Sequence, residues 1–195
     1  TLTVALQTYF KMKGNGKILS LENYPNNQIG VLGNTTGNLS YQGMTISPSG
    51  RKAGFLLLLD LDFNYKKKVL FNSTVEASVK GMTIDNEGNT YITGHFKNNL
   101  WIGQSIYSSN GGYDIFLAKL SPTGDLLSVN TYGGYGDDIS SKLKKMKWNY
   151  KVPGGFVTNF PQRKVNTFGN GQGIDNEGNL IGFEMRTDGE RGSFL

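Results

Sequence analysis

Residues 81–96, GMTIDNEGNTYITGHF, and residues 111–138, GGYDIFLAKLSPTGDLLSVNTYGGYGDD, decide the fold that we expect for this chain. Short runs rich in β-branched and aromatic residues alternate there with Gly- and Asn-containing turns. Such runs favour strands, because branched and aromatic side chains pack well on a pleated surface, while Gly and Asn favour tight turns. We predict an antiparallel meander with strands at 81–85, 89–96, 101–107, 113–120 and 126–134, and with a turn at 108–112.

The strand DIFLAKL carries apolar side chains on both faces. Phe116, Ala118 and Leu120 share one face, whereas Ile115 and Leu117 share the other. A sheet that is apolar on both faces needs a neighbour on each side. Stacked four-stranded blades of a β-propeller supply such neighbours. The rival architecture is a β-solenoid, whose repeats are usually much shorter.

The pattern repeats along the chain. Residues 28–59 resemble residues 88–120 at a shift of 61 residues, which places Val31 on Ile92 and Phe55 on Phe116. Further matches place 9–24 on 117–132 and residues after 157 on those after 92. The string IDNEGN, at 84–89 and 174–179, is out of phase, so we interpret it as one turn used twice. The matches divide the chain into units at 1–24 (partial), 25–75, 76–138 and 139–195.

Length and composition indicate a single globular domain and exclude several kinds of protein and site. The chain has 195 residues, 27 of them Gly, no Cys and a net charge of +5. The length suits one domain with a real core, and the absence of Cys removes disulfides and thiolate metal sites. No apolar stretch approaches the roughly 18 residues of a membrane-spanning helix. The chain starts at Thr1, and we expect that residue to be a processed end or an interior cut.

The run over 81–138 resembles the SBBP family, a bacterial repeat named for its seven-bladed β-propeller. The resemblance is strong across 81–138, partial across 25–75 and weak after 139, where ISSKLKKMKWNYK replaces the next glycine-led strand. It implies an exported protein of the bacterial cell envelope or surface, and it implies no catalytic residues. The positions that match the family pattern are Asp85, Gly88, Asn89, Tyr91, Thr93, Gly94, Phe116, Lys119, Leu120, Gly133, Gly134, Gly136, Asp137 and Asp138.

The expected fold is therefore all-β, an antiparallel β-propeller segment of about three and a half four-stranded blades. That number is too small to close a seven-membered ring, and an open ring leaves two unpaired edges. We expect the chain to be part of a larger polypeptide, or one half of an assembly that closes in pairs.

Few residues carry recognisable chemistry. His95 is the only histidine, so any Ser–His–Asp relay would have to use it, and the chain has no Gly-x-Ser-x-Gly elbow. Calcium needs six to eight oxygen ligands. The weak candidates for it are Asp85, Asp137, Asp138 and Asp175. The competing interpretation is that Asp caps the amides of its own turn while Gly takes the positive-φ position. No cofactor is expected.

A basic run with aromatic residues is the sharpest surface feature of the sequence. It could bind an acidic protein or an anionic glycan, and it could equally be a solvated connector or a short amphipathic helix that begins at Asp138. No nucleic-acid motif accompanies it, which argues against nucleic acid. A smaller run covers 66–68. The partner-binding candidates are Lys142, Lys144, Lys145, Lys147, Trp148, Tyr150 and Lys151.

The leading functional hypothesis is a non-enzymatic protein-binding or scaffold module in an extracytoplasmic assembly of a bacterial cell envelope. The alternatives are a glycan-binding adhesin module and a propeller-type glycoside hydrolase. The hydrolase would need two convergent carboxylates, which can be far apart in sequence.

Overall fold

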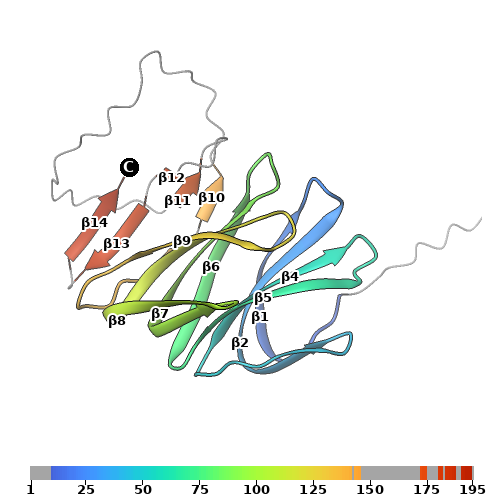
Figure 1. The fold of residues 1–195 in the computed structure, drawn as a ribbon, viewed down its shortest axis with the longest axis horizontal. Helices are drawn as coiled ribbons and strands as arrows, with labels where there is room; N and C mark the ends of the chain where they lie inside the picture. Colours follow the sequence, from blue (N-terminus) through green and yellow to red (C-terminus); the bar gives the residue numbers. More distant parts are fainter. Residues whose placement is uncertain are drawn as a thin grey trace, which may run out of the picture.

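The computed structural model describes residues 10–141 and 143–145, together with short strands at 172–174, 180–181, 183–187 and 190–194. Every element in these residues is a β-strand, and the strands of the main sheet pair in antiparallel fashion (Figure 1). The predicted all-β class is therefore confirmed. Within the described residues, no helix is long and apolar enough to cross a membrane.

Four strands of the N-terminal half form a meander that we call the first unit. A short strand, β3 (Met44–Ile46), pairs with the end of its second strand. The predicted boundary between residues 24 and 25 falls between the first two strands, which the structure joins in one hairpin. The strands of the first unit are β1 (Lys13–Asn23), β2 (Gln28–Tyr41), β4 (Ala53–Asp60) and β5 (Tyr65–Ser73).

The next four strands form a second meander, the second unit. Its strands are β6 (Glu76–Ile84), β7 (Thr90–Ile102), β8 (Ser105–Leu120) and β9 (Leu126–Tyr132). The units are joined where Phe71–Ser73 of β5 pairs with Leu100–Ile102 of β7. This short pairing places both units in one open nine-stranded sheet (Figure 1). An open sheet fixes the all-β class without establishing propeller blades.

Two of the predicted elements in the second unit are wrong. The predicted strand 101–107 contains a hairpin turn, and the predicted turn at 108–112 lies within β8. The hairpin turns at Gly103, whose φ of +62° favours glycine. Ser108 pairs with Asn99 and Tyr113 pairs with Lys97, so residues 109–112 form an irregularity within β8 opposite Asn98. Sequence composition indicated a turn there because Gly and Asn are common in irregular strands as well.

Strand pairing repeats between the units with the shift of 61 residues seen in the sequence. In the first unit Gly33 of β2 lies opposite Phe55 of β4, and in the second unit Gly94 of β7 lies opposite Phe116 of β8. In both pairs the phenylalanine ring occupies the space that a Cβ on the glycine would need. Its nearest ring carbon would lie 2.5 Å from that Cβ. The repeated glycine is therefore a packing requirement.

A five-residue turn of one type closes the first and the last hairpin of each unit. The first N–H donates to the fifth carbonyl, and the fourth residue has a positive φ, which is the arrangement of a type I turn with a glycine-type bulge. The turns run from Tyr24 to Gln28, Asp60 to Asn64, Asp85 to Asn89 and Ser121 to Asp125, with positive φ at Asn27, Phe63, Gly88 and Gly124.

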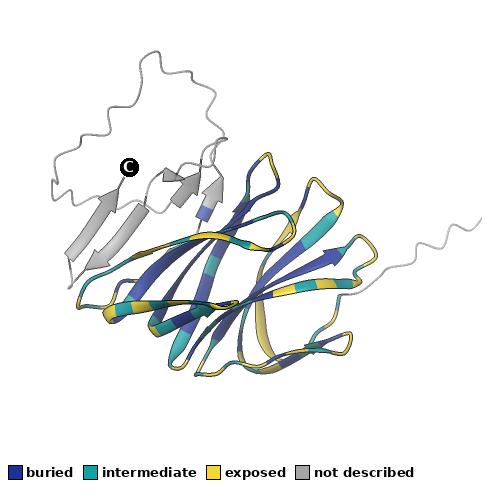
Figure 2. Ribbon diagram, viewed as in Figure 1, coloured by how far each residue is buried: buried dark blue, intermediate teal, exposed yellow. Residues whose placement is uncertain are grey.

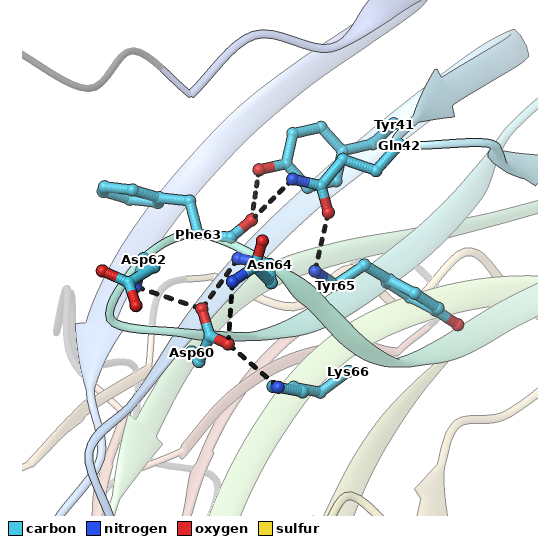
Figure 3. A network of polar contacts seen from close by, with 8 residues as sticks. All are labelled: Tyr41, Gln42, Asp60, Asp62, Phe63, Asn64, Tyr65 and Lys66. Carbon is cyan, nitrogen blue, oxygen red and sulfur yellow. Dashed lines mark hydrogen bonds and ion pairs between the residues drawn. The ribbon is translucent and has the colours of Figure 1, made fainter.

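The turn at 60–64 is also tied to the neighbouring β2–β3 turn (Figure 3). The Asp60 carboxylate accepts bonds from the N–H groups of Asp62 and Asn64 at 3.0 and 2.8 Å. The Phe63 carbonyl accepts bonds from the Tyr41 hydroxyl and the Gln42 side chain. Side-chain bonds of this kind hold a turn whose fourth residue is not glycine.

The main core lies between the two units. Leu56 and Leu58 of β4 face it from the first unit, and Val79 and Met82 of β6 face it from the second. The rings of Phe71 and Phe116 stack across it with centroids 5.4 Å apart. Buried residues concentrate in the central strands, whereas β1 is exposed along almost its whole length (Figure 2). A second cluster, which includes Phe55, Leu57 and Leu59, fills the opposite face of the first unit.

Short strands follow the second unit. β10 (Leu143–Lys145) pairs in parallel with β11 (Gln172–Ile174), which pairs with β12 (Leu180–Ile181). β13 (Phe183–Thr187) and β14 (Glu190–Phe194) form a separate hairpin. The alternative of an amphipathic helix from Asp138 is wrong over 143–145, which is extended and hydrogen-bonded to a neighbouring strand.

Candidate functional site

A cavity of about 1070 Å³ lies between the first strands of the two units. Three of its walls come from β1, β2 and β6, and a fourth comes from the segment that precedes β10. The lining is polar with two apolar side chains, and the described residues give it no carboxylate and no aromatic ring. The residues are Asn15, Gly16, Lys17, Leu19, Asn34, Thr36, Lys52, Ser78, Val79, Lys80, Ser140 and Ser141.

Matched β-bulges bring two of these side chains to the cavity. The register of β1 slips between Ile18 and Ser20, and that of β6 slips between Val79 and Gly81. A bulge inserts one residue that lies outside the ladder and re-aims its side chain. The inserted residues are Leu19 and Lys80, which are related by the shift of 61, and both line the cavity.

The shift of 61 residues also relates the first strand of the second unit to residues at the start of a third unit. Adding 61 to Val79 and Lys80 gives Ser140 and Ser141, both of which line the cavity. Adding 61 to Met82–Ile84 of β6 gives β10, and Leu143 is buried against Tyr91 and Leu117 of the second unit. Corresponding positions of three successive units therefore meet at one cavity. The sequence signal for this is the period itself, although ISSKLKK does not resemble the other first strands.

Asn34 braces the wall between the units. Its side-chain amide donates to the Val79 carbonyl and accepts from the Val79 N–H, both at 2.9 Å. This pair of bonds imitates a ladder pairing between β2 and β6 at the position where the bulge begins. The brace fixes the backbone beside Lys80.

Positive charge dominates the cavity. Lys52 forms an ion pair with Glu76, with 3.2 Å between the nitrogen and the oxygen. Burial lowers the pKa of Lys80, the charge of Lys52 lowers it further, and Glu76 opposes both effects. A cation that is partly removed from water beside another cation is stabilised by an added anion. The site is therefore suited to negative charge.

His95 is a buried strand residue. It is 6% exposed and meets the Tyr113 ring edge-on at 5.4 Å. Burial, with a smaller contribution from the charge of Lys80, lowers its pKa to about 4, so the imidazole is neutral at pH 7. Among the described residues its Nδ1 has no hydrogen-bond partner. His95 is therefore a neutral side chain packed within the sheet.

Two carboxyl-bearing residues, Glu22 and Asp85, line a second cavity of about 340 Å³. Asp85 already accepts bonds from the N–H groups of Glu87 and Asn89 and from the Asn89 side chain. The oxygens of this carboxylate are thus engaged within the turn. The predicted role of Asp85 as the cap of its own turn is confirmed, with Gly88 at a φ of +85°.

The other calcium candidates also bind amides. Asp137 accepts from the Tyr113 N–H at 3.0 Å, and Asp138 accepts from the Gly134 N–H at 2.9 Å. Asp138 is fully buried, close to Asp114. In the described part of the chain, no group of three or more His, Cys, Asp or Glu residues could hold a metal ion. Asp175 lies outside the described residues.

The basic run falls mostly on undescribed residues. The backbone of Lys144 and Lys145 lies in β10. Lys142, Lys147, Trp148, Tyr150 and Lys151 lie outside the described residues, so the predicted patch stays a prediction. The three lysines of the smaller run, 66–68, all have partners within the chain. Lys66 forms an ion pair with Asp60, Lys67 forms one with Asp125, and Lys68 donates a hydrogen bond to the Thr45 carbonyl.

Sequence reasoning missed Lys17, Lys52 and Lys80, because none of them belongs to a run. A comparison with protein-family models and with curated proteins found no match for this chain. The resemblance to the SBBP family therefore stays a prediction from the residues quoted above.

Proposed function

We propose that this chain is a non-enzymatic protein-binding or scaffold module built from β-propeller repeats. Each four-stranded unit is one blade in this proposal, and the chain supplies blades to a larger ring. The support is the common strand order, register and turn of the two units, together with the core that packs one unit face to face on the other.

One contrast between equivalent residues carries the proposal. Val79 and Met82 of β6 are 0% and 4% exposed because the first unit covers them. Their equivalents in β1, Ile18 and Leu21, are 37% and 55% exposed. The face of β1 that is exposed in the first unit is thus equivalent to the face of β6 that is buried in the second unit, and it is free to contact a neighbour. Apolar side chains exposed on an edge strand favour association.

The partner that fits this face is another four-stranded unit of the same kind. Val79 packs where a Cβ on Gly54 of β4 would lie, so the covering unit must present a small residue at that place. A blade of the same repeat that carries a small residue there meets this requirement. In a second copy of this chain Gly54 is already covered by Val79, so two copies would pair through the exposed side chains of β1 themselves, and a second copy is the partner to test in solution.

The resemblance to the SBBP family supports an extracytoplasmic location in a bacterial cell envelope. A propeller hydrolase is less well supported, because no described residue brings a carboxylate to the larger cavity and Asp85 of the smaller one is held by three donors. The glycan-binding alternative draws support from the basic cavity.

Sedimentation velocity tests the proposal across a wide range of concentration. We expect the chain to associate, and we expect Leu21→Asp to abolish association, because burying a charge in an apolar interface costs several kcal/mol. Leu127→Asp is the matched control, since Leu127 is 54% exposed on β9. A chain that stays monomeric throughout, or equal loss in both variants, would overturn the proposal.

A further inference from the structure

We propose that the cavity between the first strands of the units binds an acidic saccharide. The lysines would hold its carboxylate or sulfate group, and the hydroxyl and amide side chains would hold its hydroxyl groups. This inference goes beyond the docking of units, because it uses the cavity and not the exposed side chains of Ile18 and Leu21.

The charge of the lining favours an anion. Lys17, Lys52 and Lys80 line the cavity, and none of its described lining residues is acidic. Glu76 pairs with Lys52 from outside the lining and also acts on Lys80, and within the described part of the chain neither Lys17 nor Lys80 forms an ion pair. Lys80 is held on the bulge beside the Asn34 brace, so its backbone is fixed before a ligand arrives. Such preorganisation lowers the entropic cost of binding.

Two buried hydroxyl groups also lack partners. Ser140 is 4% exposed, and the Oγ atoms of Ser140 and Ser141 are buried without a hydrogen-bond partner among the described residues. Buried polar groups are nearly always hydrogen-bonded in folded proteins. Both serines line the cavity, so a rotation about χ1 would bring either hydroxyl to a ligand there.

The size and lining of the cavity favour a saccharide over a bare ion or a nucleic acid. Its volume of about 1070 Å³ matches the upper range of small-molecule sites and greatly exceeds the needs of one sulfate. Leu19, which is 37% exposed, can contact the apolar face of a sugar ring. Bases of single-stranded nucleic acid stack on aromatic side chains, and none of the residues described around this cavity is aromatic.

Isothermal titration calorimetry with four probes tests the proposal on the whole chain. Trigalacturonate combines charge with sugar, maltotriose has sugar without charge, inorganic sulfate has charge without sugar, and an oligothymidylate represents nucleic acid. We expect trigalacturonate to bind at least tenfold more tightly than the other three. A preference for sulfate or the oligonucleotide, equal binding of maltotriose, or no binding of trigalacturonate would overturn the proposal.

Variants place the binding in the cavity. Lys80→Gln should weaken the binding of trigalacturonate about tenfold or more, because it removes a partly buried charge–charge contact. Lys13→Gln is the matched control: it removes the same charge from β1, and Lys13 does not line the cavity. Equal loss in both variants would mean that the saccharide binds to general surface charge, which would overturn the site.

Acetylation of lysines in the unaltered protein gives a test that depends on no variant. Trigalacturonate should protect Lys17, Lys52 and Lys80 and leave Lys13 reactive; uniform protection, or none, would contradict the site. The Leu21→Asp variant should still bind trigalacturonate. Loss of self-association and loss of saccharide binding are therefore separate results.

Discussion

Asn34 and His95 occupy the same position in the two units, yet their side chains have different surroundings. Asn34 satisfies both of its polar ends on the Val79 backbone. His95 is buried, and its Nδ1 has no hydrogen-bond partner among the described residues. Burial therefore costs more free energy at His95 than at Asn34, although the two residues occupy equivalent positions. His95 is also the one of the two that can take up a proton.

The lowered pKa of His95 should make the free energy of unfolding depend on pH. Its pKa is about 4 in the folded chain and near 6.5 when unfolded, so the unfolded state binds more protons between these values. Stability is then full above the unfolded pKa and declines as the pH falls toward the folded pKa, by up to about 3 kcal/mol. His95→Asn, which installs the residue of the first unit, should flatten the slope in urea unfolding. An unchanged slope would contradict the depressed pKa.

At the scale of elements, the sequence predicts strands and turns wherever backbone chemistry decides them. The Asp85 turn could be predicted because Gly88 suits a positive φ. The positive φ at Phe63 could not be predicted, since a bulky residue disfavours it and the bonds that its carbonyl accepts come from Tyr41 and Gln42, which are distant in sequence. The bulges at Leu19 and Lys80 left no local signal, because a bulge is a property of two strands together.

The paired glycine and phenylalanine of adjacent strands give an element-scale prediction. A Cβ on Gly94 would lie 2.3 Å from the Ser78 carbonyl oxygen and 2.5 Å from the Phe116 ring. Gly94→Ala should therefore destabilise the chain by about 2 kcal/mol through overpacking. Gly37→Ala on β2 is the control, because its nearest neighbour would lie at 3.5 Å. Urea unfolding in which the two variants behave alike would contradict the packing requirement.

For the whole molecule, the period was the most informative part of the sequence. It predicted the matching registers of the two units, because corresponding apolar positions recur wherever a unit must pack on its neighbour. The basic cavity could not be predicted in the same way. Lys17, Lys52 and Lys80 are far apart in sequence, and only the stacking of units brings them together.

The stacking should make the two units unfold together. Phe71 and Phe116 stack between the units, so Phe71→Leu and Phe116→Leu should each cost about 1–2 kcal/mol. Their double-mutant cycle should show a coupling energy of about 0.5–1.5 kcal/mol. Phe55 belongs to the separate cluster, so Phe55→Leu with Phe116→Leu should be additive. A coupling near zero for the stacked pair, measured by denaturant unfolding, would mean that the units are independent.

Residues in the hydrogen-bonded ladder maintain this fold, whereas the residues inserted at the bulges can vary. Leu19 and Lys80 stand outside the hydrogen-bonded ladder, and Ser141 occupies the corresponding place after one more period. Each unit thus contributes one side chain to the cavity that strand pairing does not constrain. Gene duplication followed by substitution at this single place per unit could change the ligand in steps, while every copy kept the same scaffold.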